Sequence, residues 1–170
     1  STLARGATSV FGIALDQDGD TDVVAASATD DRILWFQNDG SESFTLIEIA
    51  SPGLSNAADG ASSVSVADLD GDGDLDVMSS SENDNRVAWY QNDGSENFTT
   101  VTLTSGSVRA TSVVAGDLDG DGDLDVIVAA RVFGEIVWFG GIFPTDFGHA
   151  PDTGAGTRNA HYNTTESHNH

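Results

Sequence analysis

The sequence contains no cysteine, and only six basic residues accompany 28 acidic ones among its 170 residues. Without cysteine, no disulfide can stabilise the fold. The formal net charge of −22 disfavours nucleic acids and anionic membrane surfaces as partners, because both repel an acidic protein. Long apolar runs are also missing, so we expect no membrane insertion. A chain of this length can form one sizeable core, but it needs a stabilising element other than a covalent cross-link.

The acidic residues are concentrated in three copies of one nine-residue stretch. The sequence Asp-Leu-Asp-Gly-Asp-Gly-Asp-Leu-Asp at 68–76 recurs at 117–125, and a degenerate copy occupies 14–22. The three copies hold 14 of the 28 acidic residues, so the negative charge is largely local. Carboxylates at every second position repel one another unless a cation lies among them, and Ca²⁺ is the hard divalent cation that prefers such oxygen ligands.

The similarity between the copies extends well beyond the acidic stretch. The segment 35–45 reappears with two changes at 89–99, and the Trp-Phe pair at 138–139 follows at the same place in a third copy. The chain is therefore three tandem units of about 50 residues. We assign 7–57, 58–106 and 107–150 to the units, with a lead-in at 1–6 and a polar tail at 151–170.

Each unit predicts short strands separated by turns, and no window shows helical periodicity. The strands are Val-rich and nearly continuous in apolar or small residues, as in sheets that are buried on both faces. Four antiparallel strands in about 50 residues are typical of a β-propeller blade, so we predict an all-β fold of three such blades. The expected strands are 62–67, 76–80, 86–91 and 98–103 in the second unit, and 111–116, 125–130 and 135–139 in the third.

The third unit lacks a clear fourth strand. A segment containing Gly and Pro, 140–151, stands where that strand is expected. The tail at 151–170 has almost no apolar residues, and its composition predicts disorder. Its alternative roles are to supply the missing strand or to wrap a neighbouring chain.

The nine-residue stretch has the chemistry of a calcium loop. Carboxylates at positions 1, 3, 5 and 9 can converge on one cation, with the main-chain carbonyl of position 7 completing the set. Glycine at position 6 permits a sharp turn, as in an EF-hand, but no flanking helices and no Glu at position 12 are present. A single Asp-Gly run is usually a solvated turn, whereas three copies in register favour a metal. The predicted metal ligands are Asp68, Asp70, Asp72, Asp74 and Asp76; Asp117, Asp119, Asp121, Asp123 and Asp125; and Asp16, Asp18, Asp20 and Asp22.

The three predicted Ca²⁺ sites are unequal. The first copy has Ala14 at position 1, where the other two have aspartate. We therefore expect up to three Ca²⁺ per chain, with the first site the weakest.

Each unit also carries a tryptophan at one equivalent place, namely Trp35, Trp89 and Trp138. Aromatic residues that recur at the end of a predicted strand are expected to pack between blades. Stacking on a sugar ring is the alternative role.

The acidic stretches resemble the D-x-D-G-D-G-x-x-D calcium loops of FG-GAP and VCBS repeats in integrin-like β-propellers. The likeness covers about residues 7–139 and is closer to the bacterial VCBS type, because only the first unit has the family's Phe-Gly pair at its repeat position, Phe11-Gly12, where the other units have Ser65-Val66 and Val114-Ala115. It implies a structural calcium in each blade and a propeller used for adhesion or ligand recognition, or as an accessory domain of a secreted enzyme. Calcium loops of this plain oxygen type suit calcium-rich surroundings, so we expect an extracellular or cell-surface location.

Three blades are too few to close a propeller, which needs about four to eight. Two chains supply six, so we expect a homodimer that closes a six-bladed ring. Two functional hypotheses follow: a non-catalytic scaffold that recognises a protein or a glycan, or the propeller domain of a secreted lyase or dehydratase acting on carbohydrates. No nucleophile and base pair or phosphate-binding loop stands out, which favours the scaffold.

Overall fold

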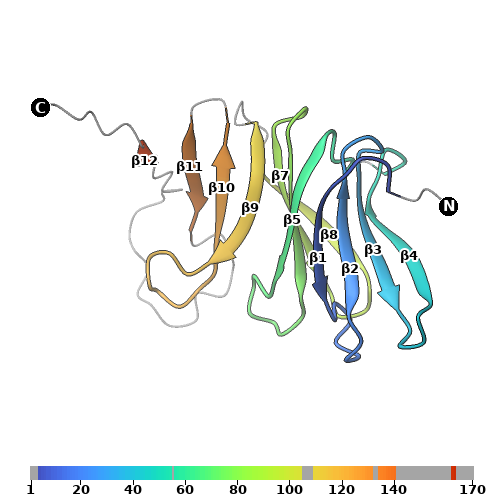
Figure 1. Ribbon diagram of the computed structural model, residues 1–170. Coiled ribbons are helices and arrows are strands. Elements are labelled where there is room, and N and C mark those ends of the chain that lie inside the picture. Colours follow the sequence, from blue (N-terminus) through green and yellow to red (C-terminus); the bar gives the residue numbers. More distant parts are fainter. Residues whose placement is uncertain (1–3, 55, 105–108, 132–133, 141–161, 164–170) are drawn as a thin grey trace, which may run out of the picture.

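The computed structural model describes residues 4–54, 56–104, 109–131, 134–140 and 162–163, and within these ranges the chain forms strands and turns. No described segment is a helix that could cross a membrane. The strands make three four-stranded antiparallel sheets (Figure 1). They are β1 (Ala7–Ile13), β2 (Asp22–Ser27), β3 (Arg32–Asn38), β4 (Phe44–Ala50), β5 (Ala61–Ala67), β6 (Asp76–Ser81), β7 (Arg86–Asn92), β8 (Phe98–Thr104), β9 (Ala110–Gly116), β10 (Asp125–Ala130), β11 (Glu135–Phe139) and β12 (Tyr162–Asn163).

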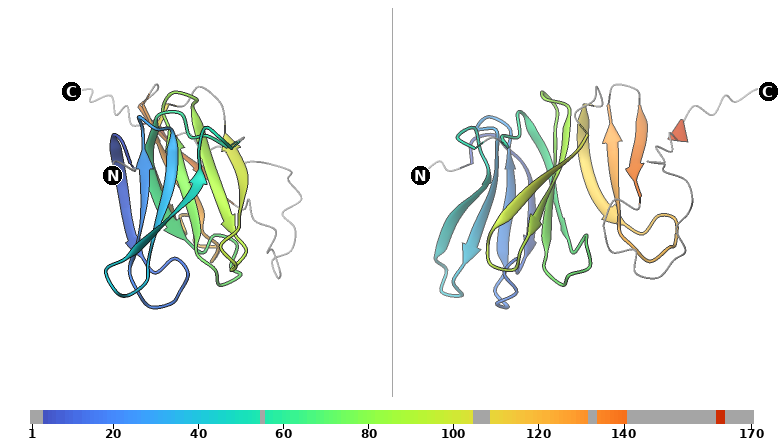
Figure 2. Two further views of the ribbon diagram at one scale, coloured as in Figure 1. Left: turned by 90° about the vertical axis from the view of Figure 1, so that its right-hand side faces the viewer. Right: turned by 180° about the vertical axis from the view of Figure 1, so that it is seen from behind.

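Strands that follow one another in the chain are neighbours in each sheet, giving the orders β1-β2-β3-β4, β5-β6-β7-β8 and β9-β10-β11-β12. The three sheets stand side by side, and the views from the front and from behind agree on this (Figures 1 and 2). Strand β5 contacts both β1 and β9, so the first strands of the sheets lie together. This is how consecutive blades are arranged in a β-propeller.

The predicted strands of the second and third units are confirmed to within one residue at each end. Their burial differs from one end of the molecule to the other. Every residue of β6 in the central blade is buried, whereas β1 in the first blade has no fully buried residue. The expectation of strands buried on both faces therefore holds for β6. It is wrong for β1, because no described blade packs on one of its faces, and for β8, the last strand of the central sheet, which has no fully buried residue either.

The core consists of two layers of side chains between neighbouring blades. One cluster joins the first and second blades and contains Trp35, Ile33 and Tyr90. The other joins the second and third blades and contains Trp89 and Met78. The predicted packing between blades is confirmed for Trp35 and Trp89, which belong to these two layers. Trp138 is buried as well but belongs to neither layer.

The tail supplies the fourth strand of the third blade. Tyr162 pairs with Ile136 and Asn163 with Glu135, so β12 extends the sheet beyond β11. One of the roles considered for the tail is thus observed. The degenerate segment at 140–151, apart from Gly140, lies outside the described residues.

The three acidic stretches form the loops β1–β2, β5–β6 and β9–β10, and all three lie at the same end of the molecule, the lower end in Figure 1. The β3–β4 and β7–β8 turns lie at this end too. Gly94 in the β7–β8 turn has a φ of +70°, and a Cβ there would collide with the Asp74 carboxylate. Glycine is required at this position for both reasons, and the turn packs directly against the acidic loop.

Candidate metal centres

The aspartate at position 9 closes each loop. In the second loop, Asp76 is fully buried and its Oδ2 accepts the N–H of Leu69 at 3.1 Å. Its Oδ1 accepts the N–H of Asn92 at 2.8 Å, which fastens the loop to the end of β7. Asp22 accepts the equivalent pair of N–H groups in the first loop. In the third loop, Asp125 accepts the equivalent of the first bond at 2.8 Å.

The aspartate at position 1 organises the turn inside the loop. Asp68 accepts the N–H groups of the glycines at positions 4 and 6, at 2.8 and 3.0 Å, and Asp117 does the same at 2.7 and 3.2 Å. Ala14 has no carboxylate to make these bonds. The first loop also places Gln17 at position 4 with a φ of +61°, where the other two loops have glycine. A residue other than glycine is strained in this region of φ. The first loop therefore lacks the two hydrogen bonds made by position 1 and carries backbone strain at position 4.

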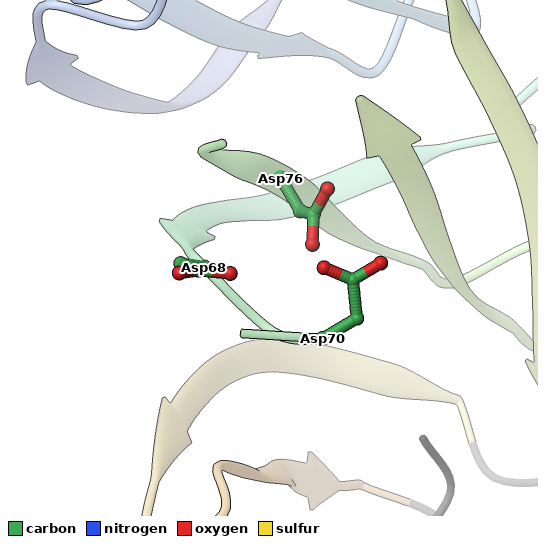
Figure 3. Close-up of side chains that lie close together, drawn as sticks. All are labelled: Asp68, Asp70 and Asp76. Atoms are coloured by element: carbon green, nitrogen blue, oxygen red, sulfur yellow. The ribbon is translucent and has the colours of Figure 1, made fainter. Parts of the chain in front are cut away.

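Two groups of carboxylates converge among the described residues. In the second loop, Asp68, Asp70 and Asp76 each place one oxygen within 4.8 Å of the others, and the carboxylates of Asp70 and Asp76 face each other (Figure 3). The third loop brings together Asp117, Asp119 and Asp121 in the same way. The first loop forms no such trio within the described residues.

The two trios share positions 1 and 3 of the predicted ligand set. Position 9 joins them in the second loop and position 5 in the third. In both loops the position-5 carboxylate also accepts the N–H of position 7, at 2.9 and 3.0 Å, and Asp18 does the same in the first loop at 2.8 Å. Coordination by the position-7 carbonyls of Asp20, Asp74 and Asp123 stays a prediction.

Burial raises the pKa of Asp76 to about 6, against the hydrogen bonds from Asn92, Leu69 and Trp89, and the neighbouring Asp70 adds to the rise. Burial also raises the pKa of Asp70 and of Asp125, and in each case repulsion from other aspartates of the same loop contributes. These carboxylates resist ionisation as long as no cation is present, and a divalent cation would relieve that resistance.

Asp16 in the first loop behaves in the opposite way. Burial acts to raise its pKa, but hydrogen bonds from Gln37 and Asp18 outweigh burial, and the pKa lies below its usual value. In the first loop, where Ala14 replaces an aspartate, hydrogen bonds thus stabilise the Asp16 carboxylate without a cation. This difference supports the expectation that the first of the three sites binds Ca²⁺ most weakly.

Two glutamines support the loops from the neighbouring strands, and the sequence reasoning missed them. Gln37 at the end of β3 donates to Asp16 at 2.7 Å, and Gln91 at the end of β7 donates to Asp70. The third blade has Gly140 at the equivalent place. The signal was present in the repeated Trp-aromatic-Gln triplet, whose third residue recurs in only two of the three units.

The donor set fits Ca²⁺. The converging atoms are all carboxylate oxygens, with no nitrogen or sulfur ligand among them, and oxygen is the ligand that Ca²⁺ prefers. Two charges 4.8 Å apart repel by about 1 to 3.5 kcal/mol at effective dielectrics of 80 and 20, and three carboxylates form three such pairs. A cation among them would convert this repulsion into attraction.

Three blades of four antiparallel strands, each with an acidic loop between its first and second strands, define a repeat protein of the β-propeller type. Comparison with known protein families gives the same answer: the FG-GAP-like repeat matches residues 15–79 and 68–128, and the FG-GAP repeat matches residues 110–157. The chain therefore belongs to the FG-GAP repeat family, and the resemblance expected from the acidic loops is confirmed. A search of curated proteins found no match.

Proposed function

We propose that the protein is a calcium-stabilised propeller module that acts as a scaffold for recognition of a protein or a glycan. The observation that carries the calcium assignment is the convergence of three carboxylates in the second loop and again in the third. Calcium has a structural role in this proposal, because the loops join the first two strands of each blade and two of the ligands, Asp70 and Asp76, are buried. A buried carboxylate bound to a divalent cation is a poor general acid, which argues against catalysis at these loops.

The recognition role rests on the fold and on where the turns lie. The acidic loops and the β3–β4 and β7–β8 turns gather at one end of the blades, where they form a surface of short exposed segments on a rigid scaffold (Figure 1). Binding residues commonly lie on such loops. An extracellular or cell-surface location agrees with FG-GAP repeats being typical of extracellular proteins and with calcium sites that need a high free concentration.

Calcium titration of the melting temperature tests the structural role. We expect the melting temperature to rise with added Ca²⁺, to rise less with equal Mg²⁺, and to fall with chelator, since ligands that bind only the folded state stabilise it. Asp119→Asn should reduce the calcium-dependent rise, whereas Glu42→Gln, an exposed residue outside the loops, should leave it unchanged. A melting temperature that does not respond to calcium would overturn the proposal.

A glycan array tests recognition separately. The chain is applied with calcium and with chelator, and binding that disappears with chelator supports a glycan ligand held by the calcium-ordered end of the blades. Silence on every glycan would leave a protein as the ligand, to be sought by the same comparison with surface proteins.

A further inference from the structure

The two ends of the three-blade array expose apolar side chains whose repeat equivalents are buried inside. Val64 of the second blade faces the first blade and is only 5% exposed. Its equivalent in β1, Val10, is 67% exposed, because none of the described blades packs against that face of the first blade. The exposed face of the first blade thus has the chemistry of a face that packs against a preceding blade.

The opposite end has the matching chemistry. Leu69, at position 2 of the second acidic loop, is 3% exposed in the layer that joins the second and third blades. Its equivalent in the third loop, Leu118, is 50% exposed, because none of the described blades packs against that face of the third blade. Val114 and Ile136 are exposed on the third blade as well, while their equivalents in the second blade are buried. This end therefore has the chemistry of a face that packs against a following blade.

An aromatic pair shows the same relation between the ends. Phe98 of the second blade meets Trp35 of the first edge-on, with ring centroids 6.2 Å apart and an interplanar angle of 82°. The equivalent of Phe98 in the first blade is Phe44, which is 52% exposed, and the equivalent of Trp35 in the third blade is Trp138. Phe44 and Trp138, which correspond to the two partners of this aromatic contact, thus lie at opposite ends of the three-blade array.

Hydroxyl groups link the first strands of neighbouring blades and leave one link open. Thr8 Oγ1 donates to the carbonyl of Ala61 at 2.7 Å, and Ser62 Oγ donates to the carbonyl of Ala110 at 2.9 Å. The next hydroxyl in this series is that of Thr111, whose described bond goes to a carbonyl of its own blade at 3.3 Å. Its acceptor in a following blade would be the equivalent of Ala61, which is Ala7 of a first blade.

We propose that a second copy of this chain occupies both ends, with the first blade of each copy packed against the third blade of the other. In this contact, the two chains meet through residues equivalent to those that pack between neighbouring blades within one chain. Two copies give six blades, within the four to eight of closed propellers, whereas one copy gives three and three copies give nine. The exposed side chains that carry this comparison, Val10 on the first blade and Val114, Leu118 and Ile136 on the third, are all apolar, so each end offers apolar area to bury. A twofold ring also leaves no end open for further growth.

Sedimentation of the full chain with calcium, over a hundredfold range of concentration, tests the proposal. We expect the mass of two chains and no larger species. Leu118→Glu should shift the chain to a monomer, whereas Leu54→Glu, which also replaces an exposed leucine but lies in the β4–β5 connection, should leave the dimer intact. Both leucines are exposed within one chain, and a wild-type circular dichroism spectrum with a cooperative melting transition shows that each variant is folded.

Mixing two blocked variants tests which faces meet. Val10→Glu blocks the first blade and Leu118→Glu blocks the third, so each variant alone should be monomeric. Their mixture should form dimers, because one of the two contacts in the ring is then between unblocked faces. A monomeric wild type, a series of growing polymers, or dimers of either variant alone would overturn the proposal, and none of these outcomes depends on whether calcium stabilises the fold.

Discussion

At the scale of single residues, Asp76 uses one carboxylate for two roles: it closes its loop, and it is a predicted metal ligand. Both oxygens accept backbone N–H groups, which closes the loop and attaches it to β7. Each carboxylate oxygen has a second lone pair, and one oxygen of Asp76 lies within 4.8 Å of Asp68 and Asp70 oxygens. Closing the loop is needed with or without a cation, whereas coordination matters only when calcium is bound.

Comparison of Asp76→Ala with Asp72→Ala separates these tasks. In chelator, Asp76→Ala should lower the free energy of unfolding by about 2 to 4 kcal/mol, because two buried N–H groups lose their acceptor. Asp72 is exposed, so Asp72→Ala should change the free energy by about 0.5 kcal/mol or less in chelator. Denaturant unfolding with and without calcium measures both. Equal losses for the two variants in chelator would show that Asp76 does not close the loop.

The raised pKa of Asp76 makes the stability depend on pH with opposite signs in chelator and in calcium. The folded state holds this proton up to a pH of about 6, while the unfolded state releases it near 3.8, the ordinary pKa of an aspartate. The stabilisation is therefore complete below 3.8 and is lost as the pH rises through 6. Lowering the pH from 7.5 to 5 in chelator should stabilise the protein by roughly 1 kcal/mol from Asp76 alone. Asp70 and Asp125 contribute with the same sign.

In calcium the same change of pH should lower the melting temperature, because protons compete with the cation for these carboxylates. Thermal unfolding at pH 5 and 7.5, with calcium and with chelator, checks both signs. A melting temperature that falls on acidification in chelator would contradict the prediction.

At the scale of the element, the three loops share one closure but differ in their turns. The position-9 aspartate accepts the N–H of position 2 in every loop. Only the second and third loops have an aspartate at position 1 and a glycine at position 4. Gln17 compensates in part, because its side chain donates to the carbonyl of Gly73 in the neighbouring loop at 2.7 Å. The first loop is thus held by the next blade rather than by its own first residue.

Restoring the two missing residues should create a third full calcium loop. In Ala14→Asp with Gln17→Gly, the new carboxylate can accept the N–H groups of positions 4 and 6, and the glycine removes the strain at a φ of +61°. Calorimetric titration should show the first site binding calcium more tightly than in the wild type. Gln17→Gly alone is the control, since it removes the strain without adding a ligand, and an equal gain in affinity there would contradict the role given to position 1.

The strands, the acidic loops and the set of candidate ligands could be predicted from local pattern, while which of those carboxylates converge could not. Valine-rich runs and Asp-Gly turns act over a few residues, so β6, β7 and the loop at 68–76 were identified from sequence. Which carboxylates converge depends on how β7 sits beside the loop, since its Asn92 N–H orients Asp76 and its Gln91 side chain orients Asp70. These contacts join positions 16 to 21 residues apart, beyond the reach of a local pattern.

At the scale of the whole molecule, the proposed calcium site of the third loop and the proposed dimer contact meet at one residue. Leu118 stands at position 2 of the third loop, between the predicted ligands Asp117 and Asp119, and is exposed on the end face of the third blade. In the first two loops the equivalent leucine is buried against the following blade. A cation that orders the third loop therefore places Leu118 for contact with a second copy.

We expect chelator to weaken the dimer and, by linkage, dimer formation to tighten calcium binding at the third loop. Sedimentation equilibrium at several calcium concentrations measures the dissociation constant of the dimer, which should rise as calcium is removed. Asp119→Asn should abolish most of this dependence, because it disables the loop on the end face. Asp70→Asn disables a loop inside the array and should lower the melting temperature while the dependence of dimer formation on calcium persists. If the two variants changed that dependence equally, the coupling would run through overall stability and not through the end face.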